Sequence, residues 1–342
     1  MDVHEKYMKQ CIKEAENGLG TVGANPLVGC VVVHGAKIIG TGYHEKYGAP
    51  HAEVNAINAV SKKPLLKDAT LYVSLEPCSH HGKTPPCTGM ILNSGIRKVV
   101  IGAVDTNDAV SGHGADLLKK AGCEVITGVL DKQCREQNRR FFTFIEQKRP
   151  YVILKWAQTN AGLFAESNDK QTWITGAAAQ QIAHRWRAEE GAVLVGTNTA
   201  KVDNPRLTCR EWRGRDPVRV VLDRTLRLDQ DLNLFDRSVP TLVFNEIKEF
   251  HYESIEYVKL NFGERVVHHL LAELHKRNIQ SVMVEGGKEL LNSFLKAGVW
   301  DEARVLVGQD SFMEGIAAPN LSIAPYKTMD ADGDKVLLYN NH

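Results

Sequence analysis

The spacing of apolar residues in the first part of the chain predicts a helix followed by two strands. The N-terminal segment has apolar residues three and four positions apart, as in an amphipathic helix, at Met8, Cys11, Ile12 and Ala15. The segment LVGCVVVHGAKIIGTGYH, residues 27–44, instead contains two apolar runs separated by a glycine. It predicts two strands that are joined by a tight turn at Gly35 and end near His44.

Helices and strands then alternate through the rest of the first half. We expect His51 to open a helix that runs to Val60, and further helices over residues 85–94 and near 114–121. The apolar segments ATLYVSLEP, KVVIGAVD and CEVITGVL predict strands. Such alternation is typical of a layered α/β sheet. In such sheets, active-site groups lie at the ends of the strands and in the loops that follow them.

A domain boundary is predicted after the helical stretch at residues 131–147. There the sequence EQKRPYVILKWAQ passes through a charged turn with Pro150 into a new buried strand. Helical spacing returns at 176–188, 263–277 and 288–297. Apolar strands are expected at 151–157, 192–199, 218–225, 241–246, 281–287, 303–309 and 335–340. The sequence therefore predicts two α/β domains, residues 1–147 and 148–342, without an internal repeat or a low-complexity linker.

Composition argues against several classes of protein. The 342 residues carry 42 lysines and arginines against 41 aspartates and glutamates, so no overall field attracts nucleic acid or an anionic membrane. The charged start of the chain does not resemble a signal peptide, and no apolar run approaches the roughly 20 residues that span a bilayer. Seven cysteines are an odd number spread over a long chain. They argue against a disulfide framework and for the reducing cytoplasm.

Candidate metal ligands occur where predicted strands and loops meet predicted helices. His51 precedes Glu53 by two residues in HAEVNAI, and Cys78 and Cys87 each follow a proline in EPCSHHGKTPPC. One imidazole and two thiolates match a catalytic zinc site, in which three protein ligands leave the fourth position for water. Because two thiolates weaken the acidity of the metal, a nearby carboxylate must take the proton of the water, and Glu53 is placed for this. The order His-x-Glu, Pro-Cys, Cys is that of the zinc nucleobase deaminases.

Two other interpretations of these residues compete with a catalytic zinc site. In the first, His51 and Glu53 are ordinary residues at a helix start, and the cysteines lie in the core without a metal. In the second, the zinc is structural and has His80 or His81 as its fourth ligand. A closed structural site has no use for the carboxylate of Glu53, so four matched elements in this order favour catalysis.

The segment between the two cysteines is longer than the Cys-x-x-Cys of cytidine and tRNA deaminases. With this segment, the chain resembles the bifunctional deaminase–reductase family of riboflavin biosynthesis. The resemblance covers the whole chain, and its markers are NPLVGCV from Asn25, HAEVNA, PCSHHGKTPPC and DTNDAVSGHG from Asp105. It implies a cytidine-deaminase-like three-layer α/β domain followed by a dihydrofolate-reductase-like domain. It also implies Zn²⁺ and NADPH as cofactors.

The resemblance implies a small-molecule substrate, 2,5-diamino-6-(5-phosphoribosylamino)pyrimidin-4-one. Its ring would be deaminated by hydrolysis, and NADPH would then reduce the ribosyl side chain to ribityl. The contacts to the deaminase substrate would be Asn25, His44, Lys83, Asp105 and Asn107. Asn and Asp side chains suit the donor–acceptor edge of a pyrimidine, and a lysine suits a phosphate. Each residue also has an ordinary alternative, such as a turn at Asn25 or a solvated lysine at Lys83.

The second half contains two segments that suit a nucleotide. The strand–Gly–Gly–helix junction in VEGGKELLNSFL would bring backbone N–H groups and a helix N-terminus towards a phosphate. Two glycines also serve close packing alone, and the junction lacks the three-glycine Rossmann fingerprint. The segment TNTAKVDNPRLTCR, residues 197–210, follows an apolar strand with polar side chains that suit an anion and a ribose. A solvated loop would look similar.

Positions that match the family's reductase imply a second set of contacts. Nucleotide contacts would be Ala157, Trp173, Thr199, Asp203, Gly286, Gly287 and Lys288. Contacts to the reductase substrate would be Lys155, Gln171, Arg187, Leu207, Arg210 and Glu285. The two arginines suit a 5′-phosphate, which a guanidinium group binds through two N–H groups at once. Trp173 would otherwise be a core aromatic residue.

Two positions depart from the family's pattern. Where the family has Ser-x-Asp-Gly, this chain has Thr-Asn-Ala-Gly at residues 159–162, and Gln171 stands where a serine is usual. The change at Ala161 is expected to remove a carboxylate from the neighbourhood of the substrate, unless Glu166 or Asp169 replaces it. These two departures therefore concern the predicted reductase activity and not the predicted deaminase activity.

Three functions compete at this point. The chain would be a bifunctional deaminase and reductase, or a deaminase whose second domain only binds a nucleotide or serves assembly. A nucleic-acid deaminase is the third, and the balanced charge and the lack of a basic-aromatic cluster argue against it. We expect a cytoplasmic homo-oligomer that acts on a small molecule, with neither nucleic acid nor membrane as a partner.

Overall fold

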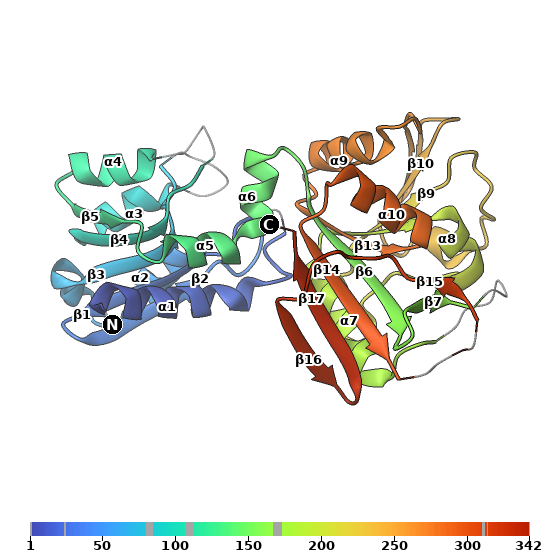
Figure 1. Ribbon diagram of the computed structural model, residues 1–342. Coiled ribbons are helices and arrows are strands. Elements are labelled where there is room, and N and C mark those ends of the chain that lie inside the picture. Colours follow the sequence, from blue (N-terminus) through green and yellow to red (C-terminus); the bar gives the residue numbers. More distant parts are fainter. Residues whose placement is uncertain are drawn as a thin grey trace. The chain divides into compact units, whose positions relative to one another are not determined.

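The chain divides into two compact units, residues 1–147 and 148–342. The computed structural model describes residues 2–23, 25–79, 85–106, 112–166, 173–309, 312 and 314–341. Each unit contains a β-sheet with helices packed on its faces (Figure 1). Among the described residues, we find no helix with both the length and the apolar character needed to cross a bilayer.

The first unit contains five strands and six α-helices among its described residues. Its helices are α1 (Val3–Ala15), α2 (Ala52–Ala59), α3 (Cys87–Asn93), α4 (His113–Lys120), α5 (Asp131–Gln137) and α6 (Arg139–Glu146). Its strands are β1 (Gly29–His34), β2 (Lys37–Tyr43), β3 (Thr70–Leu75), β4 (Lys98–Ala103) and β5 (Glu124–Thr127). Two short 3₁₀ helices lie at Glu16–Gly18 and Lys63–Asp68.

The five strands form one sheet in the order β2-β1-β3-β4-β5. Strand β1 is antiparallel to β2 and to β3, whereas β3, β4 and β5 are parallel. Because side chains alternate along a strand, Val31 and Val33 face α1, α5 and α6, while Cys30 and Val32 face α2, α3 and α4. The predicted three-layer arrangement is confirmed, and the carboxyl ends of β3 and β4 lead into the segments that carry Cys78 and Asp105.

The helical stretch predicted at residues 131–147 is two helices rather than one. Helix α5 ends at Gln137 and α6 begins at Arg139, with Asn138 at φ −99° and ψ 21° between them. The Asn138 side chain forms hydrogen bonds with the backbone of Leu27. The helical spacing therefore predicted both helical segments. It did not predict the junction between them, because the hydrogen bonds of Asn138 are made with Leu27, which is distant in the sequence.

The second unit has more strands. Its helices are α7 (Ala177–Glu189), α8 (Thr197–Asp203), α9 (Val266–Lys276) and α10 (Lys288–Ala297), with a 3₁₀ turn at Asn233–Phe235. Its strands are β6 (Tyr151–Thr159), β7 (Leu163–Ala165), β8 (Ala192–Gly196), β9 (Val218–Leu222), β10 (Thr241–Asn245), β11 (Phe250–Tyr252), β12 (Ile255–Lys259), β13 (Ser281–Gly286), β14 (Glu302–Gly308), β15 (Ile316–Ala317), β16 (Lys327–Ala331) and β17 (Asp334–Asn340).

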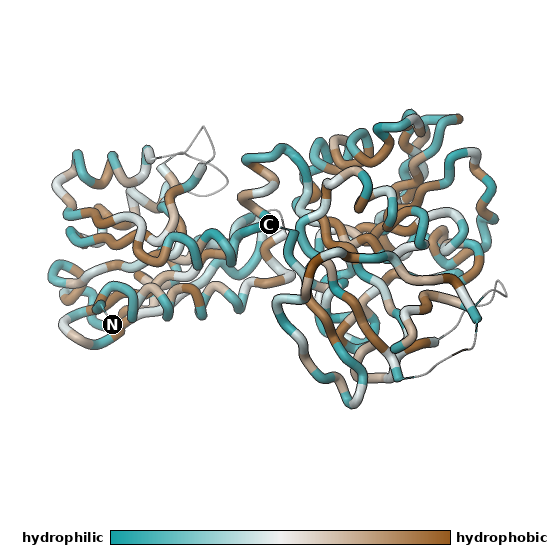
Figure 2. The backbone as a smooth tube through the Cα atoms, in the orientation of Figure 1, coloured by the Kyte–Doolittle hydropathy of each residue, from teal (hydrophilic) through white to brown (hydrophobic). Residues whose placement is uncertain are grey.

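Ten of these strands form one sheet in the order β11-β12-β10-β9-β8-β13-β6-β14-β17-β16. The run from β12 to β14 is parallel, and the strands at both ends are antiparallel. Helices α9 and α10 pack on one face, and α7 and α8 pack on the other. Hydrophobic residues accordingly follow the central strands (Figure 2). A parallel sheet buried on both faces needs such continuous apolar strands.

The segment at 192–199 differs from its prediction. The strand ends at Gly196, and α8 starts at the next residue. The polar segment 197–210 therefore begins with a helix rather than with the loop considered above. Helix α8 has only seven residues, of which Ala200 is the buried one, so its sequence carries almost no helical apolar spacing.

Candidate functional site

The three predicted metal ligands come together in the first unit. His51 is the N-cap of α2, Cys87 is the first residue of α3, and Cys78 follows β3 by three residues. The ligand atoms of all three lie within 4.8 Å of one another. The interpretation of these cysteines as unrelated core residues is therefore wrong.

The geometry of the three ligands fits zinc. His51 Nδ1 lies 3.6 Å from Cys78 Sγ and 3.3 Å from Cys87 Sγ. A tetrahedral zinc ion with Zn–S bonds of about 2.3 Å and Zn–N bonds of about 2.0 Å holds sulfur and nitrogen about 3.5 Å apart. The imidazole Nδ1, the nitrogen nearer the backbone, is therefore the zinc ligand that this geometry supports.

The side chains of Cys78 and Cys87 interact with each other. The hydrogen bond from Cys87 is the main cause that lowers the pKa of Cys78 to about 4, and the contact with His51 acts in the same direction. The same contact with Cys78, followed by burial, raises the pKa of Cys87. The Cys87 backbone N–H also donates to Cys78 Sγ, at 3.3 Å. The site therefore stabilises one thiolate by itself, and a bound cation would displace the second proton.

Glu53 lies in the first turn of α2 beside these ligands, and only 3% of its surface is exposed. Burial raises the pKa of its carboxyl group, while its own backbone and His51 oppose the shift. A hydrogen bond with Cys87 also acts on it, so the carboxyl group lies against the metal ligands. A carboxyl group with a raised pKa is suited to accept and return a proton near neutral pH.

Asn25 and His44 form a hydrogen-bonded pair beside the metal ligands. Asn25 Nδ2 lies 2.8 Å from His44 Nε2, and His44 Nδ1 lies 3.3 Å from the carbonyl oxygen of Pro50. Burial lowers the pKa of His44. A neutral imidazole that donates to Pro50 must accept from the Asn25 amide nitrogen. The His44 ring is edge-on to that of His51, at 5.3 Å.

Glu76 was not predicted as a site residue, yet it joins the metal segment to the substrate segment. One carboxylate oxygen accepts from the backbone N–H of Asp105 and of Gly112, at 3.2 and 3.0 Å, and the other accepts from Ala115 at 2.9 Å. Glu76 is buried and lies two residues before Cys78. Its place directly before a Pro-Cys pair is the sequence signal that would have found it.

The second unit contains a cavity of about 970 Å³ at the carboxyl ends of its parallel strands. Its walls come from β6, α7, α8, the β13–α10 junction and the segment after β7. The predicted residues that line it are Lys155, Ala157, Trp173, Arg187, Thr199, Asp203, Leu207, Arg210, Glu285, Gly287 and Lys288. Lys83, Asn107 and Gln171, like His80, His81 and Asp169, lie outside the described residues.

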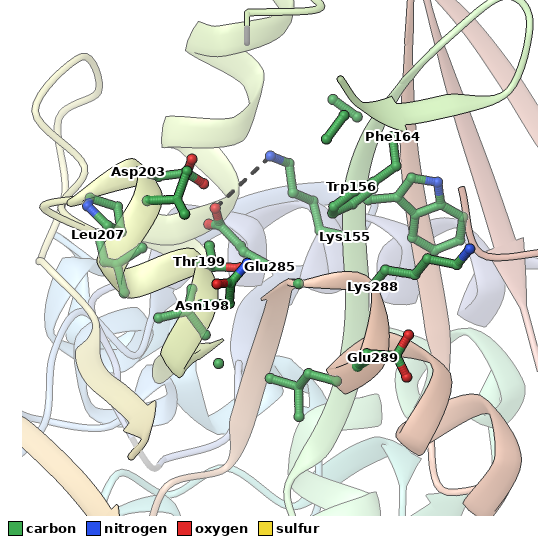
Figure 3. Close-up of a pocket in the computed structure, with 18 of the residues that line it drawn as sticks. Lys155, Trp156, Phe164, Asn198, Thr199, Asp203, Leu207, Glu285, Lys288 and Glu289 are labelled. Atoms are coloured by element: carbon green, nitrogen blue, oxygen red, sulfur yellow. Dashed lines mark ion pairs between the residues drawn. The ribbon is translucent and has the colours of Figure 1, made fainter. Parts of the chain in front are cut away.

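Three charged side chains meet in this cavity. Arg187 donates from Nε and Nη2 to the two carboxylate oxygens of Glu285, at 2.6 and 2.7 Å. Lys155 Nζ lies 3.9 Å from Glu285 Oε2 (Figure 3). Burial alone would raise the pKa of Glu285, but the charges of Arg187 and Lys155 lower it to about 2. Burial also lowers the pKa of Lys155.

The pairing of Arg187 limits the N–H groups that it can offer to a phosphate. The Nε and Nη2 groups of Arg187 are bound to the carboxylate of Glu285, and its Nη1 donates to the Thr208 carbonyl oxygen at 3.2 Å. Two of its five N–H groups at most remain for a substrate phosphate. Arg210 is more open, with 46% of its side chain exposed and Glu211 at 3.7 Å. Arg210 is therefore the better placed of the two arginines for a phosphate.

The β13–α10 junction has the form expected for a nucleotide contact. Gly286 has φ +122°, which side-chain-bearing residues rarely adopt, and Gly287 is the N-cap of α10. A Cβ atom at Gly287 would lie 3.0 Å from Thr199 Oγ1. The glycines thus let Thr199 approach the backbone N–H groups at the start of α10, where an anion is favoured.

Trp173 and Ala161 differ in their position relative to the cavity. Trp173 is 58% exposed and lines the cavity, so its interpretation as a core residue is wrong. Ala161 is exposed in the turn after β6, and within the described part of the chain it is not a lining residue of this cavity. The expectation that its substitution removes a carboxylate from beside the substrate is not supported, whereas Glu166 does line the cavity.

Comparisons with known proteins agree with both sites. Residues 1–103 match the cytidine and deoxycytidylate deaminase zinc-binding region, and residues 150–309 match the RibD C-terminal domain. The riboflavin biosynthesis protein RibD of Aquifex aeolicus is 42% identical over 328 residues, which cover 94% of this chain and 91% of that protein.

Solved structures are similar over nearly the whole length. A diaminohydroxyphosphoribosylaminopyrimidine deaminase/5-amino-6-(5-phosphoribosylamino)uracil reductase from Thermotoga maritima is 38% identical, with a TM-score of 0.87 and coverage of 99% of this chain and 98% of that chain. RibD of Acinetobacter baumannii is 32% identical, with a TM-score of 0.89 and 98% of both chains covered. The predicted fold classes and the resemblance are confirmed, and this chain belongs to the RibD family of riboflavin-biosynthesis proteins.

Proposed function

We propose that this chain catalyses two successive steps of riboflavin biosynthesis. Residues 1–147 deaminate the ring of 2,5-diamino-6-(5-phosphoribosylamino)pyrimidin-4-one, and residues 148–342 use NADPH to reduce the ribosyl side chain to ribityl. The observation that carries the proposal is the convergence of His51, Cys78 and Cys87 at zinc-binding distances beside buried Glu53. The cavity of the second unit, with its buried charges and its Gly-Gly-helix junction, supports the second step.

The deamination is a hydrolysis at one ring carbon. Zinc, when bound, supplies the positive charge that makes water a nucleophile near neutral pH. Glu53 takes one proton from the attacking water and delivers it to the ring nitrogen, and then takes the second proton from the new hydroxyl group and delivers it to the amino group. A C–O bond forms, the C–N bond breaks, and ammonia leaves. The burial that raises the pKa of Glu53 lets the carboxyl group hold each proton between accepting it and donating it.

Asn25 and Asp105 are proposed to recognise the ring. The Asn25 amide nitrogen is engaged by His44, so Asn25 Oδ1 accepts a hydrogen bond from a ring N–H or amino group. Asp105 is buried at the carboxyl end of β4 and would accept another. Both side chains supply acceptor oxygens, which match the N–H and amino donors on the exposed edge of a diaminopyrimidine.

The reduction requires a hydride and a proton. NADPH, when bound, would supply the hydride for C1′ of the ribose, and as the C1′–O4′ bond breaks, O4′ would need a proton. We assign the proton to Lys155, because burial lowers its pKa and makes its ammonium group a better acid. Glu285 keeps Lys155 in place and is itself oriented by Arg187.

Glu53→Gln tests the deaminase. The variant should keep its zinc, because none of the three ligands is changed, and should lose deamination by about 10²–10⁴-fold. Ammonia release and metal analysis measure the two effects. Glu124→Gln, which changes an exposed carboxylate of β5 paired with Lys98, is the matched control. A Glu53→Gln rate above about a tenth of wild type would require another proton carrier and contradict this role.

Oxidation of NADPH in the presence of the deaminated product tests the reductase. The wild-type chain and Glu53→Gln should show the same rate, since Glu53 lies in the other unit. A chain that binds NADPH but never oxidises it would instead be a deaminase with a nucleotide-binding domain.

We also propose a cytoplasmic location. It is supported by the seven cysteines, all of which are free thiols and six of which are buried, because such thiols persist in a reducing compartment. A homo-oligomer stays a prediction, which sedimentation of the purified chain would test.

A further inference from the structure

Asn138 is a buried polar residue that the proposed reactions leave unexplained. It separates α5 from α6, and only 2% of its surface is exposed. Its Oδ1 accepts from the Leu27 backbone N–H at 2.7 Å, and its Nδ2 donates to the Leu27 carbonyl oxygen at 2.8 Å. The amide also donates to the Cys134 carbonyl oxygen at 3.4 Å. One side chain thus binds both polar groups of a residue 111 positions away, as a neighbouring strand would.

Leu27 belongs to the segment that carries Asn25. Pro26, which lies between them, has no backbone N–H and offers no donor. Towards the C-terminus, the Val28 carbonyl oxygen accepts from the His44 backbone N–H at 2.9 Å. Residues 25–28 therefore pass from a turn into β1 with the Asn138 pair as the contact that holds both polar groups of Leu27.

The position of this segment sets the position of the Asn25 amide. Asn25 Nδ2 lies 2.8 Å from His44 Nε2, and the His44 ring is 5.3 Å from the ring of the zinc ligand His51. A shift of the Leu27 backbone would move Asn25 away from His44 and from the metal ligands. Displacement of a substrate contact by about 1 Å is enough to cost up to a hundredfold in rate.

We propose that Asn138 is a positioning residue of the deaminase site. Its amide holds the backbone of Leu27, and through Leu27 it places Asn25 against the pyrimidine ring. This inference rests on the deaminase function proposed for the first unit. It assigns to the α5–α6 junction, distant in sequence from every metal ligand, a part in substrate recognition.

Gln137 offers a matched control. It is the neighbour of Asn138, and its Nε2 also donates to a backbone carbonyl oxygen, that of Ile12, at 2.6 Å. Ile12 lies in α1 and not in the segment of Asn25. Gln137→Ala and Asn138→Ala therefore each remove one carboxamide group that forms a hydrogen bond with the backbone of a residue distant in the sequence. Only Asn138→Ala removes a contact with the segment that carries Asn25.

The variants Asn138→Ala, Asn138→Asp and Gln137→Ala are compared by ammonia-release kinetics on the full chain. Asn138→Asp keeps an oxygen that accepts from Leu27 but lacks the N–H donors. We expect both Asn138 variants to lower kcat/KM for deamination about tenfold or more, mainly through KM, because two or more hydrogen bonds are lost. Gln137→Ala should keep wild-type KM. Zinc content, and NADPH oxidation with the deaminated product, should be unchanged in all three.

A double-mutant cycle with Asn25→Ala separates positioning from general stability. If Asn138 acts through Asn25, Asn138→Asp should have little further effect on KM in a chain that already carries Asn25→Ala. Additive effects, a KM change equal to that of Gln137→Ala, or loss of zinc in parallel with activity would each overturn the inference. Absence of deamination in the wild-type chain would instead contradict the proposed function, so the two failures are distinguishable.

Discussion

Replacing Glu285 with glutamine should destabilise the second unit by about 3 kcal/mol. The carboxylate has a pKa of about 2 in the folded chain against an ordinary value of 4.5, and each pKa unit corresponds to about 1.36 kcal/mol. Only 8% of the Glu285 side chain is exposed, so solvent screens the interaction weakly. The loss of one partner from a buried ion pair, which leaves the other charge unpaired, costs a similar amount, about 3–5 kcal/mol.

The pH dependence of this loss has a definite sign. The folded-state pKa of Glu285 lies below its ordinary value, so the ionised carboxylate stabilises the folded state fully above about pH 4.5. That contribution is lost as the pH falls from about 4.5 towards 2. Glutamine does not titrate. The difference in unfolding free energy between wild type and Glu285→Gln should therefore be constant near neutral pH and shrink in acid.

Tryptophan fluorescence provides the assay, because every tryptophan of the chain belongs to the second unit. The five residues are Trp156, Trp173, Trp186, Trp212 and Trp300. Urea unfolding followed by this signal reports the second unit without the zinc site. Glu253→Gln, in a surface pair with Arg237 whose side chains are half exposed, is the control and should change stability by less than about 1 kcal/mol.

A double variant tests the cause of the loss. Arg187→Met combined with Glu285→Gln removes the unpaired guanidinium group, so it should be less destabilised than the sum of the two single variants. The reasoning would be refuted if Glu285→Gln were as stable as the control variant, or if its deficit did not depend on pH below 4.5.

Three further predictions concern the two sites. Cys78→Ser and Cys87→Ser should each lower zinc content and deamination together, because a protonated hydroxyl group is a poor zinc ligand, while NADPH oxidation with the deaminated product continues. Full zinc occupancy in both variants would contradict the ligand set. Glu76→Ala should lower kcat/KM for deamination by about a hundredfold with zinc retained, since three backbone N–H groups lose their acceptor. A wild-type rate would show that Asp105 does not depend on this carboxylate. Ala161→Asp should leave reductase kcat and the KM for NADPH within about twofold, because the position is exposed outside the cavity wall. A large rise in kcat would place that turn at the substrate.

The sequence by itself predicted the local elements and the chemistry of the metal site. His51, Glu53, Cys78 and Cys87 were predicted from residue type and order. The ligand atoms of His51, Cys78 and Cys87 lie within 4.8 Å of one another, and Glu53 is buried. This was possible because a zinc site restricts its ligands to a few residue types, and because ligands at the starts of helices lie at recognisable spacings. Most strands and helices were predicted because each repeats its apolar residues at its own period. The strands β7, β11, β12, β15 and β16 were not predicted.

Only the tertiary structure decided how distant polar residues pair. Nothing near Arg187 in the sequence indicates that it binds Glu285, 98 positions away. In the same way, no local pattern joins Asn138 to Leu27, or Glu76 to Asp105.

The physical reason for this difference is that apolar spacing acts within one helix or strand, whereas polar pairing joins residues that are distant in the sequence. Apolar spacing is a local property, because it follows from the repeat of a single helix or strand. A buried polar group must find its partner among all groups that the folded sheet brings near it. Strand order in the sheet brings Lys155 on β6 beside Glu285 on β13, and the packing of α7 brings Arg187 to the same carboxylate. The sequence therefore determined which groups are available for chemistry, and the tertiary structure determined which of them are already paired with one another.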